Sequence, residues 1–144
     1  MEDRYLDKAK RLDNGEWVQG YYVKGLDVFT NCEEAHIIFE PNTMFYSSGE
    51  TDGWYKVDPT TICRCTGLRD KNSRLIWKND IVNIQCGKAI VVWDKAEWRI
   101  KWIKDTIWRK DLHFWTNEGD WKCEVIGNIF DNPELLESEV GNDK

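Results

Sequence analysis

The side chains best suited to chemistry in this sequence are two histidines, five cysteines and many carboxylates. His36 and His113 lie among residues typical of strands, and neither is accompanied by a nucleophile elbow or an H-E-x-x-H pattern. Cys63 and Cys65 form a C-x-C pair, the nearest approach to a zinc motif, but further ligands would have to come from distant points of the chain. We therefore expect structural histidines and free, mostly buried thiols, with no metal and no cofactor.

The carboxylates and glycines show no catalytic spacing either. Glu33 and Glu34 are adjacent, but no second carboxylate pair is fixed across from them, and a solvated acidic surface accounts for both. The glycines form neither a G-x-G-x-x-G sequence nor a Walker sequence, so a phosphate-binding loop is unsupported. These patterns favour a non-enzymatic protein over a small hydrolase or metal enzyme.

Charge is distributed unevenly along the 144 residues, whose net charge is −6. Residues 1–61 carry a net charge of −6, residues 62–110 carry +7 and residues 111–144 carry −7. Within the basic middle, cations alternate with tryptophans over residues 93–110, a composition with which small barrels contact nucleic-acid backbones and stack bases. The candidate surface consists of Trp98, Arg99, Lys101, Trp102, Lys104, Trp108, Arg109 and Lys110.

Two interpretations of this segment stay open, and the first is favoured. In the first interpretation, Trp98 and Trp102 form a buried face and the cations form a solvent-exposed face. The acidic segments on either side then neutralise these cations in the fold. Alternatively, the basic face stays accessible and binds nucleic acid. The nine tryptophans of the chain also exceed the needs of a small core, and aromatic residues in excess mark protein interfaces.

Short hydrophobic periods, interrupted often by Gly, Asn and Asp, indicate a β-rich fold. Asn14-Gly15 predicts a hairpin between strands at 4–12 and 16–24. Short strands close together suggest a small barrel or an orthogonal sandwich, with one short helix near the C-terminus where Asn132 precedes Pro133. The remaining strands are expected at 36–39, 44–46, 75–77, 80–86, 89–93, 97–103, 112–115 and 121–129.

No run of 18 apolar residues occurs, and the charged first residues are not followed by an apolar stretch. This pattern predicts neither a membrane span nor a signal peptide. An odd number of scattered cysteines fits a reducing compartment, so a cytoplasmic location is expected.

Three blocks of the sequence resemble the YopX family of phage and prophage proteins. Residues 10–21 (KRLDNGEWVQGY) are similar to a family hairpin of the form R-x-D-N-G-x-W-V-x-G-Y. Residues 65–82 (CTGLRDKNSRLIWKNDIV) and 125–136 (VIGNIFDNPELL) are similar to the family's central and C-terminal blocks. Ser73 and Asn79 stand where the family usually has Gly, and Cys65 stands where it has an aromatic residue. Asn79 can keep a left-handed turn, whereas Ser73 would bear strain or shift the turn type.

The resemblance implies an architecture and a broad role. Residues 1–61 would form an N-terminal α+β portion involved in self-association, and residues 62–144 would form an SH3-like β-barrel with a short C-terminal helix. The implied role is that of a phage or prophage accessory protein that acts through protein–protein contacts, as a homo-oligomer and with a host or phage protein as partner. Nucleic-acid binding through 93–110 is the alternative, and no catalytic residue is carried over from the family.

Overall fold

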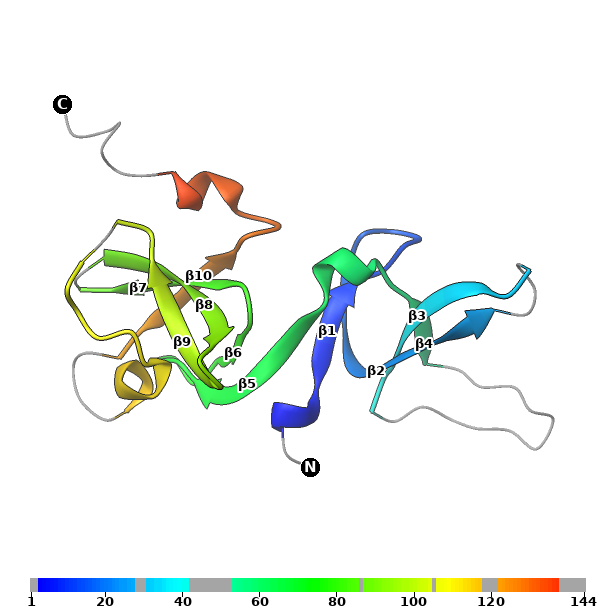
Figure 1. Ribbon diagram of the computed structural model, residues 1–144, viewed down its shortest axis with the longest axis horizontal. Coiled ribbons are helices and arrows are strands. Elements are labelled where there is room, and N and C mark those ends of the chain that lie inside the picture. Colours follow the sequence, from blue (N-terminus) through cyan, green and yellow to red (C-terminus); the bar gives the residue numbers. More distant parts are fainter. Residues whose placement is uncertain are drawn as a thin grey trace. The chain divides into compact units, whose positions relative to one another are not determined.

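The computed structural model of the protein describes residues 3–27, 31–41, 53–85, 87–104, 106–117 and 122–137. These residues are mainly antiparallel β-structure, and the chain divides into two compact units, Met1–Arg64 (unit 1) and Cys65–Lys144 (unit 2) (Figure 1). The predicted mainly β class is confirmed. The strand predicted at 44–46 lies outside the described residues.

Unit 1 is an antiparallel sheet in the order β4-β3-β2-β1, and the first residues of β5 pair with β1. The predicted hairpin at Asn14-Gly15 is confirmed, because β1 and β2 pair from Lys10–Trp17 to Asp7–Gly20. Gly15 takes a φ of 73°, whereas Asn14 keeps a negative φ. The elements are η1 (Asp3–Tyr5), β1 (Asp7–Lys10), β2 (Trp17–Asp27), β3 (Glu33–Phe39), β4 (Trp54–Lys56), η3 (Pro59–Thr61) and β5 (Cys63–Arg69).

The core of unit 1 is small. Its buried members share the side of the sheet that carries Val18 and Ile38. Three partly buried side chains pack against these members: Tyr22, Tyr55 and Ile62. The helical pieces in the described part of unit 1 are single 3-10 turns, so the expected α component is not found there. The connection at 57–62 is so short that it has room for one turn only. The Asp58 side chain caps that turn by accepting a hydrogen bond from the Thr60 N–H.

Unit 2 holds a four-stranded antiparallel sheet in the order β10-β7-β8-β9, while the last residues of β5 pair with β6. The predicted strands at 75–77, 80–86, 89–93, 97–103 and 121–129 are found with shifted ends, and Cys86 and Trp121 lie outside the described residues. The elements are β6 (Leu75–Trp77), β7 (Asp80–Ile84), β8 (Gly87–Asp94), β9 (Glu97–Trp102), η4 (Leu112–Thr116), β10 (Glu124–Asn128) and η5 (Pro133–Leu136).

The period-2 patterns in unit 2 place side chains as expected. Val82 and Ile84 are buried while Asn83 between them is exposed, and Ile100 and Trp102 are buried while Lys101 is exposed. The buried face of the sheet, Ile76 of β6, and Leu112 and Trp115 of η4 form one hydrophobic core, against which Leu68 and Trp98 pack. Strands β5 and β6 thus share a core with the four-stranded sheet.

Two predicted elements and the closed architecture need correction. Residues 112–115 form a 3-10 helix instead of a strand: Leu112 and Trp115, three residues apart, both point into the core, which is the repeat of a 3-10 turn. The short helix near the C-terminus is reduced to the 3-10 turn η5, and the Asn132 side chain does not cap it, because its Oδ1 accepts from the Asn128 N–H at 3.2 Å. Pairings among the described strands give two antiparallel sheets and no closed barrel.

A buried carboxylate organises the turn between β5 and β6. Asp70 is 3% exposed, and its Oδ1 accepts from the N–H groups of Asn72 and Arg74, both at 2.9 Å. Its Oδ2 accepts from the N–H of Val125 on β10, also at 2.9 Å. One side chain therefore fixes a local turn and ties that turn to a strand more than 50 residues away.

Candidate ligand-binding groove

Two tryptophan side chains fix the segment that follows β9. The carbonyl oxygen of Arg109 accepts from the indole N–H of Trp102 at 3.3 Å and from that of Trp115 at 3.0 Å. The two rings pack edge to face, with centroids 5.9 Å apart. The Ile100 N–H donates to the carbonyl of Lys110 at 2.8 Å, so residues around Lys110 run beside the outer edge of β9. The buried indoles thereby position an exposed lysine.

This arrangement leaves a groove of about 490 Å³ on the β8–β9 hairpin of unit 2. Pairing of Val92 with Arg99 and of Ile90 with Lys101 shows that Arg99 and Lys101 share the side of the sheet that faces away from the core. Four cations and one carboxylate line the groove, which gives it a formal charge of +3. Its lining residues are Val92, Asp94, Lys95, Arg99, Ile100, Lys101, Trp102, Ile103 and Lys110.

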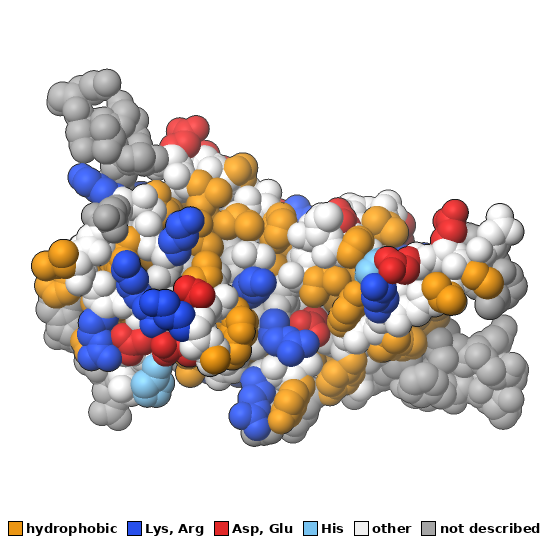
Figure 2. All heavy atoms as spheres, viewed as in Figure 1, with side chains coloured by type: hydrophobic (Ala, Val, Ile, Leu, Met, Phe, Trp, Pro, Cys, Tyr) orange, Lys and Arg blue, Asp and Glu red, His pale blue; other side chains and the backbone are white. Residues whose placement is uncertain are grey.

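The cations of the groove differ in how far they are neutralised. Arg99 donates to Glu97 at 2.9 Å and its side chain is 21% exposed. In the described part of the chain, none of Lys95, Lys101 and Lys110 has a carboxylate within ion-pair distance. Figure 2 shows Lys and Arg side chains gathered over the β8–β9 part of the surface, with acidic side chains beside them. The groove is therefore a site of net positive potential.

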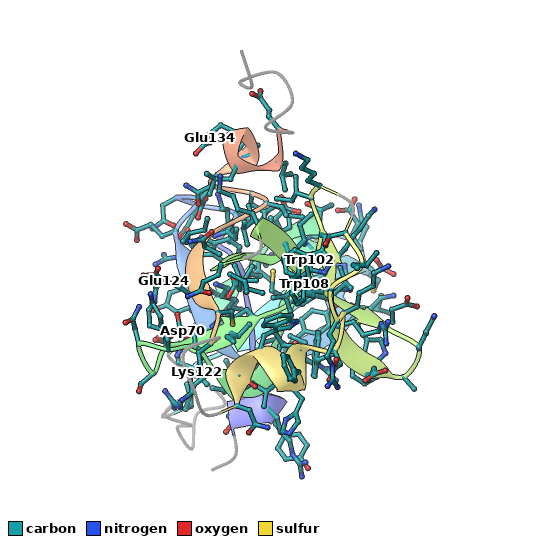
Figure 3. The ribbon with its side chains drawn as sticks, turned by 90° about the vertical axis from the view of Figure 1, so that its left-hand side faces the viewer. Asp70, Trp102, Trp108, Lys122, Glu124 and Glu134 are labelled. Carbon is teal, nitrogen blue, oxygen red and sulfur yellow. The ribbon has the colours of Figure 1, made fainter. Side chains whose placement is uncertain are left out.

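The eight residues predicted as one surface do not stay together. Arg99, Lys101 and Lys110 line the groove with exposed or half-buried side chains, but Trp102 is only 6% exposed and contributes a wall. Trp98 is half-buried against the core and meets exposed Trp93 edge to face at 5.0 Å. Of the eight predicted residues, the four that do not line the groove are Trp98, Lys104, Trp108 and Arg109. Figure 3 labels Trp102 and Trp108 close together in its view of unit 2.

Arg109 is engaged by its own neighbours. Its guanidinium makes two hydrogen bonds of 2.9 Å to Asp111 and lies 4.3 Å from the centroid of the Phe114 ring. Burial acts to raise the pKa of Asp111, but hydrogen bonds from Arg109 and from backbone N–H groups outweigh it, so the pKa lies below its usual value. An acidic residue from the C-terminal flank thus neutralises this cation, as the favoured interpretation of the segment expects.

Lys95 is the cation of the groove lining that the sequence pattern did not single out. It occupies the two-residue turn between β8 and β9 with Ala96, and the two have φ values of 53° and 60°. The apolar stretches of β8 and β9 are separated in the sequence by a short, mostly polar segment, residues 94–97, which is the length of a tight hairpin connection. The turn could have been predicted from this signal. The positive φ of a non-glycine pair is rare in such turns and weakens that signal.

The histidines and cysteines have structural surroundings. His36 Nδ1 lies 2.6 Å from the Tyr22 hydroxyl and its Nε2 lies 3.4 Å from Glu34, so both ring nitrogens are engaged. Among the described cysteines Cys32 is exposed and Cys63, Cys65 and Cys123 are buried, and none of the four is in a disulfide. Burial raises the pKa of the Cys123 thiol to about 12. The described residues contain no group of three His, Cys, Asp or Glu side chains placed to hold a metal ion.

A second feature with binding potential is the face of the unit 1 sheet opposite its core. Tyr21 pairs with Phe39, Val23 with Ile37, and Phe39 with Trp54, so these five apolar side chains share one side of β2, β3 and β4. Tyr21, Val23 and Trp54 are 38%, 48% and 39% exposed. We call these five residues the unit 1 apolar face.

Two antiparallel sheets and helical pieces limited to 3-10 turns in the described residues define a mainly β protein. Within that class the chain belongs to the YopX family, because the family model described as "YopX protein" matches residues 10–137. Comparison with curated proteins gives no match. No helix in the described part of the chain has the length and apolar character needed to cross a bilayer.

The blocks that carry the family resemblance coincide with turns and buried hydrogen bonds. In the central block, Asn79 has a φ of 73° and Ser73 a φ of 65°, so both residues keep the left-handed conformation that glycine favours. Asn79 does so as expected, and Ser73 bears the strain of a positive φ. In the C-terminal block, Asn128 Oδ1 accepts from the N–H groups of Phe130 and Asp131, both at 2.9 Å. The resemblance therefore concentrates on residues that determine the fold.

Proposed function

We propose that this YopX family member is a non-catalytic accessory protein of phage or prophage origin that acts through protein–protein contacts, and that it self-associates through unit 1. The observation that carries this proposal is the unit 1 apolar face. Five apolar side chains in register on one side of a sheet, three of them more than a third exposed, form the kind of surface that a partner covers. Family membership supports the phage or prophage origin, and the host or phage protein expected as a further partner belongs to the same proposal.

A charged residue introduced on the unit 1 apolar face tests self-association. We expect the wild-type chain to be oligomeric in light scattering, and Val23→Glu to shift it towards monomer, because the new carboxylate would be desolvated in the interface. Leu26→Glu is the matched control: Leu26 is 67% exposed on the same strand, but it lies on the other side of the sheet. A wild-type chain that stays monomeric at all concentrations would contradict the proposal.

The finer architecture expected for unit 2 also belongs to this proposal. Strands β5 and β6 pack on the same core as the four-stranded sheet, because Ile76 of β6 belongs to the cluster that contains Val91 and Trp115, and Leu68 of β5 packs against it. Short antiparallel strands around one core are the basis of small SH3-like barrels, and a barrel opened between neighbouring strands keeps that core. We propose that unit 2 is such an open SH3-like barrel in a protein of the host cytoplasm.

Nucleic-acid binding is the second candidate function, and the groove is the observation that favours it. Lys101 and Lys110 are exposed cations of the groove lining, and Trp108, which belongs to the same segment 93–110, is 49% exposed. If the segment 93–110 binds single strands, oligonucleotide will quench tryptophan fluorescence, and the logarithm of affinity will fall linearly with the logarithm of salt concentration. Unchanged fluorescence at low salt would remove this candidate.

A further inference from the structure

We propose that the groove on the β8–β9 hairpin binds an acidic, extended peptide segment of a partner protein. This inference rests on the proposed function in protein–protein contact and names a binding site and a partner chemistry for it, on a surface other than the unit 1 apolar face. Its basis is the combination of exposed lysines, strand spacing and apolar lining in one groove of about 490 Å³. Sites of that volume accept a ligand of a few residues.

Charge determines the kind of ligand. The groove has a formal charge of +3, and among the described residues Lys95, Lys101 and Lys110 lack carboxylate partners. The carboxylate that does line the groove, Asp94, accepts from the Lys95 backbone N–H at 2.9 Å. Exposed lysines without a carboxylate partner retain full charge for an incoming anion, and screening confines that attraction to about 8–10 Å. The ligand must therefore bring its negative charges into the groove.

Spacing favours an extended peptide. Arg99 and Lys101 are two residues apart on one side of β9, which sets their Cα atoms roughly 7 Å apart. An extended peptide presents side chains i and i+2 at the same separation, so of two alternate carboxylates one can meet Lys101 and the other can meet Arg99, which it would share with Glu97. Val92 and Ile103 also line the groove and give an apolar contact for a neighbouring side chain.

The lining also distinguishes a peptide from a nucleic acid. Single-stranded nucleic acid is bound by exposed aromatic rings that stack on bases, combined with cations along the backbone. The aromatic residue of the groove lining is Trp102, which is 6% exposed and whose indole N–H already donates to the Arg109 carbonyl. The overall charge of −6 further disfavours a long polyanion more than a peptide with a few carboxylates.

Fluorescence anisotropy on the full chain tests this site. The probe is a fluorescein-labelled peptide with three Glu-Val repeats, and the matched peptide has Gln in place of each Glu. We expect the glutamate peptide to bind and the glutamine peptide to bind far more weakly. Lys101→Glu or Lys110→Glu should weaken binding about two- to fivefold, in line with the worth of an exposed ion pair. Thermal melts of each variant verify that it is folded.

Lys104→Glu is the matched control, because Lys104 is an exposed lysine of the same segment that does not line the groove. We expect it to change the affinity less than twofold. An equal loss in all three variants would show that net charge alone attracts the peptide, and would overturn the site. Absence of peptide binding would overturn it as well, and so would tighter binding of a labelled oligo(dT) with the same dependence on Lys101. A negative result here leaves the light-scattering result on the unit 1 apolar face unaffected, so the two failures are distinguishable.

Discussion

Replacement of Asp70 by alanine is expected to lower the free energy of unfolding of unit 2 by about 3–5 kcal/mol. The Asp70 carboxylate accepts three backbone N–H groups, from Asn72, Arg74 and Val125, all at 2.9 Å. Alanine leaves these donors without their acceptor at a site where the wild-type side chain is 3% exposed. Because one of the donors is on β10, the substitution weakens both the 70–74 turn and the attachment of that turn to the sheet. Asp70 and Glu124, at the start of β10, are labelled on the same side of the ribbon in Figure 3.

The denaturant dependence of Cys123 alkylation measures this loss, because Cys123 is buried in the core of unit 2. Asp70→Asn should fall between wild type and alanine, since an amide oxygen can replace one carboxylate oxygen while the NH₂ group faces a donor. Asp94→Ala serves as the control: Asp94 is exposed and accepts one backbone N–H, so its loss should cost less than about 1 kcal/mol. Equal stability of the Asp70→Ala and Asp94→Ala chains would show that the buried hydrogen bonds do not stabilise unit 2.

Gly20→Ala is expected to destabilise unit 1 by about 2–4 kcal/mol. A Cβ atom at Gly20 would collide with the carbonyl oxygen of Phe39 and lie 2.7 Å from its carbonyl carbon. Both atoms belong to the backbone, so a side-chain rotation cannot relieve the contact and the end of β3 must move away from β2. The core of unit 1 is small, and this movement would separate the strands that carry Val18 and Ile38.

Gly25→Ala on the same strand is the matched control. Nothing lies within 4 Å of a Cβ built at Gly25, so alanine fits, and it should leave the stability unchanged or raise it by up to about 1 kcal/mol through the lower entropy of the unfolded chain. Alkylation of Cys63, which is buried in unit 1, reports the unfolding of this unit. If both alanine variants unfold at the same denaturant concentration, the close approach of β2 and β3 at Phe39 is not what limits the stability of unit 1.

Local patterns in the sequence predicted the elements that depend on local geometry. The alternation around Ile100 and Trp102 predicted β9, and Asn14-Gly15 predicted the first hairpin, because each signal acts within a few residues. The same reasoning was wrong for 112–115, whose apolar residues are as compatible with a strand as with a turn. In the fold, contact of Leu112 and Trp115 with one core selects the 3-10 turn.

The candidate groove was predictable only in part. Arg99, Lys101 and Lys110 were predicted as surface cations from composition, and they do line one groove. Composition also placed Trp108 and Arg109 in the same surface, because proximity along the chain says nothing about which side of a strand or loop a residue occupies. The bonds of two indole N–H groups to the Arg109 carbonyl decide that Lys110 joins the groove.

The sequence by itself determined the family, the mainly β class and the division of charge into two acidic ends around a basic middle. These properties reside in composition and short motifs. Tertiary structure alone decided which cations keep a free charge: Asp111 neutralises Arg109, and Glu124 lies 3.5 Å from Lys71, while Lys101 remains without a carboxylate partner among the described residues. Ion pairing depends on distances of a few ångströms between side chains, and only the packing of the strands and turns fixes those distances.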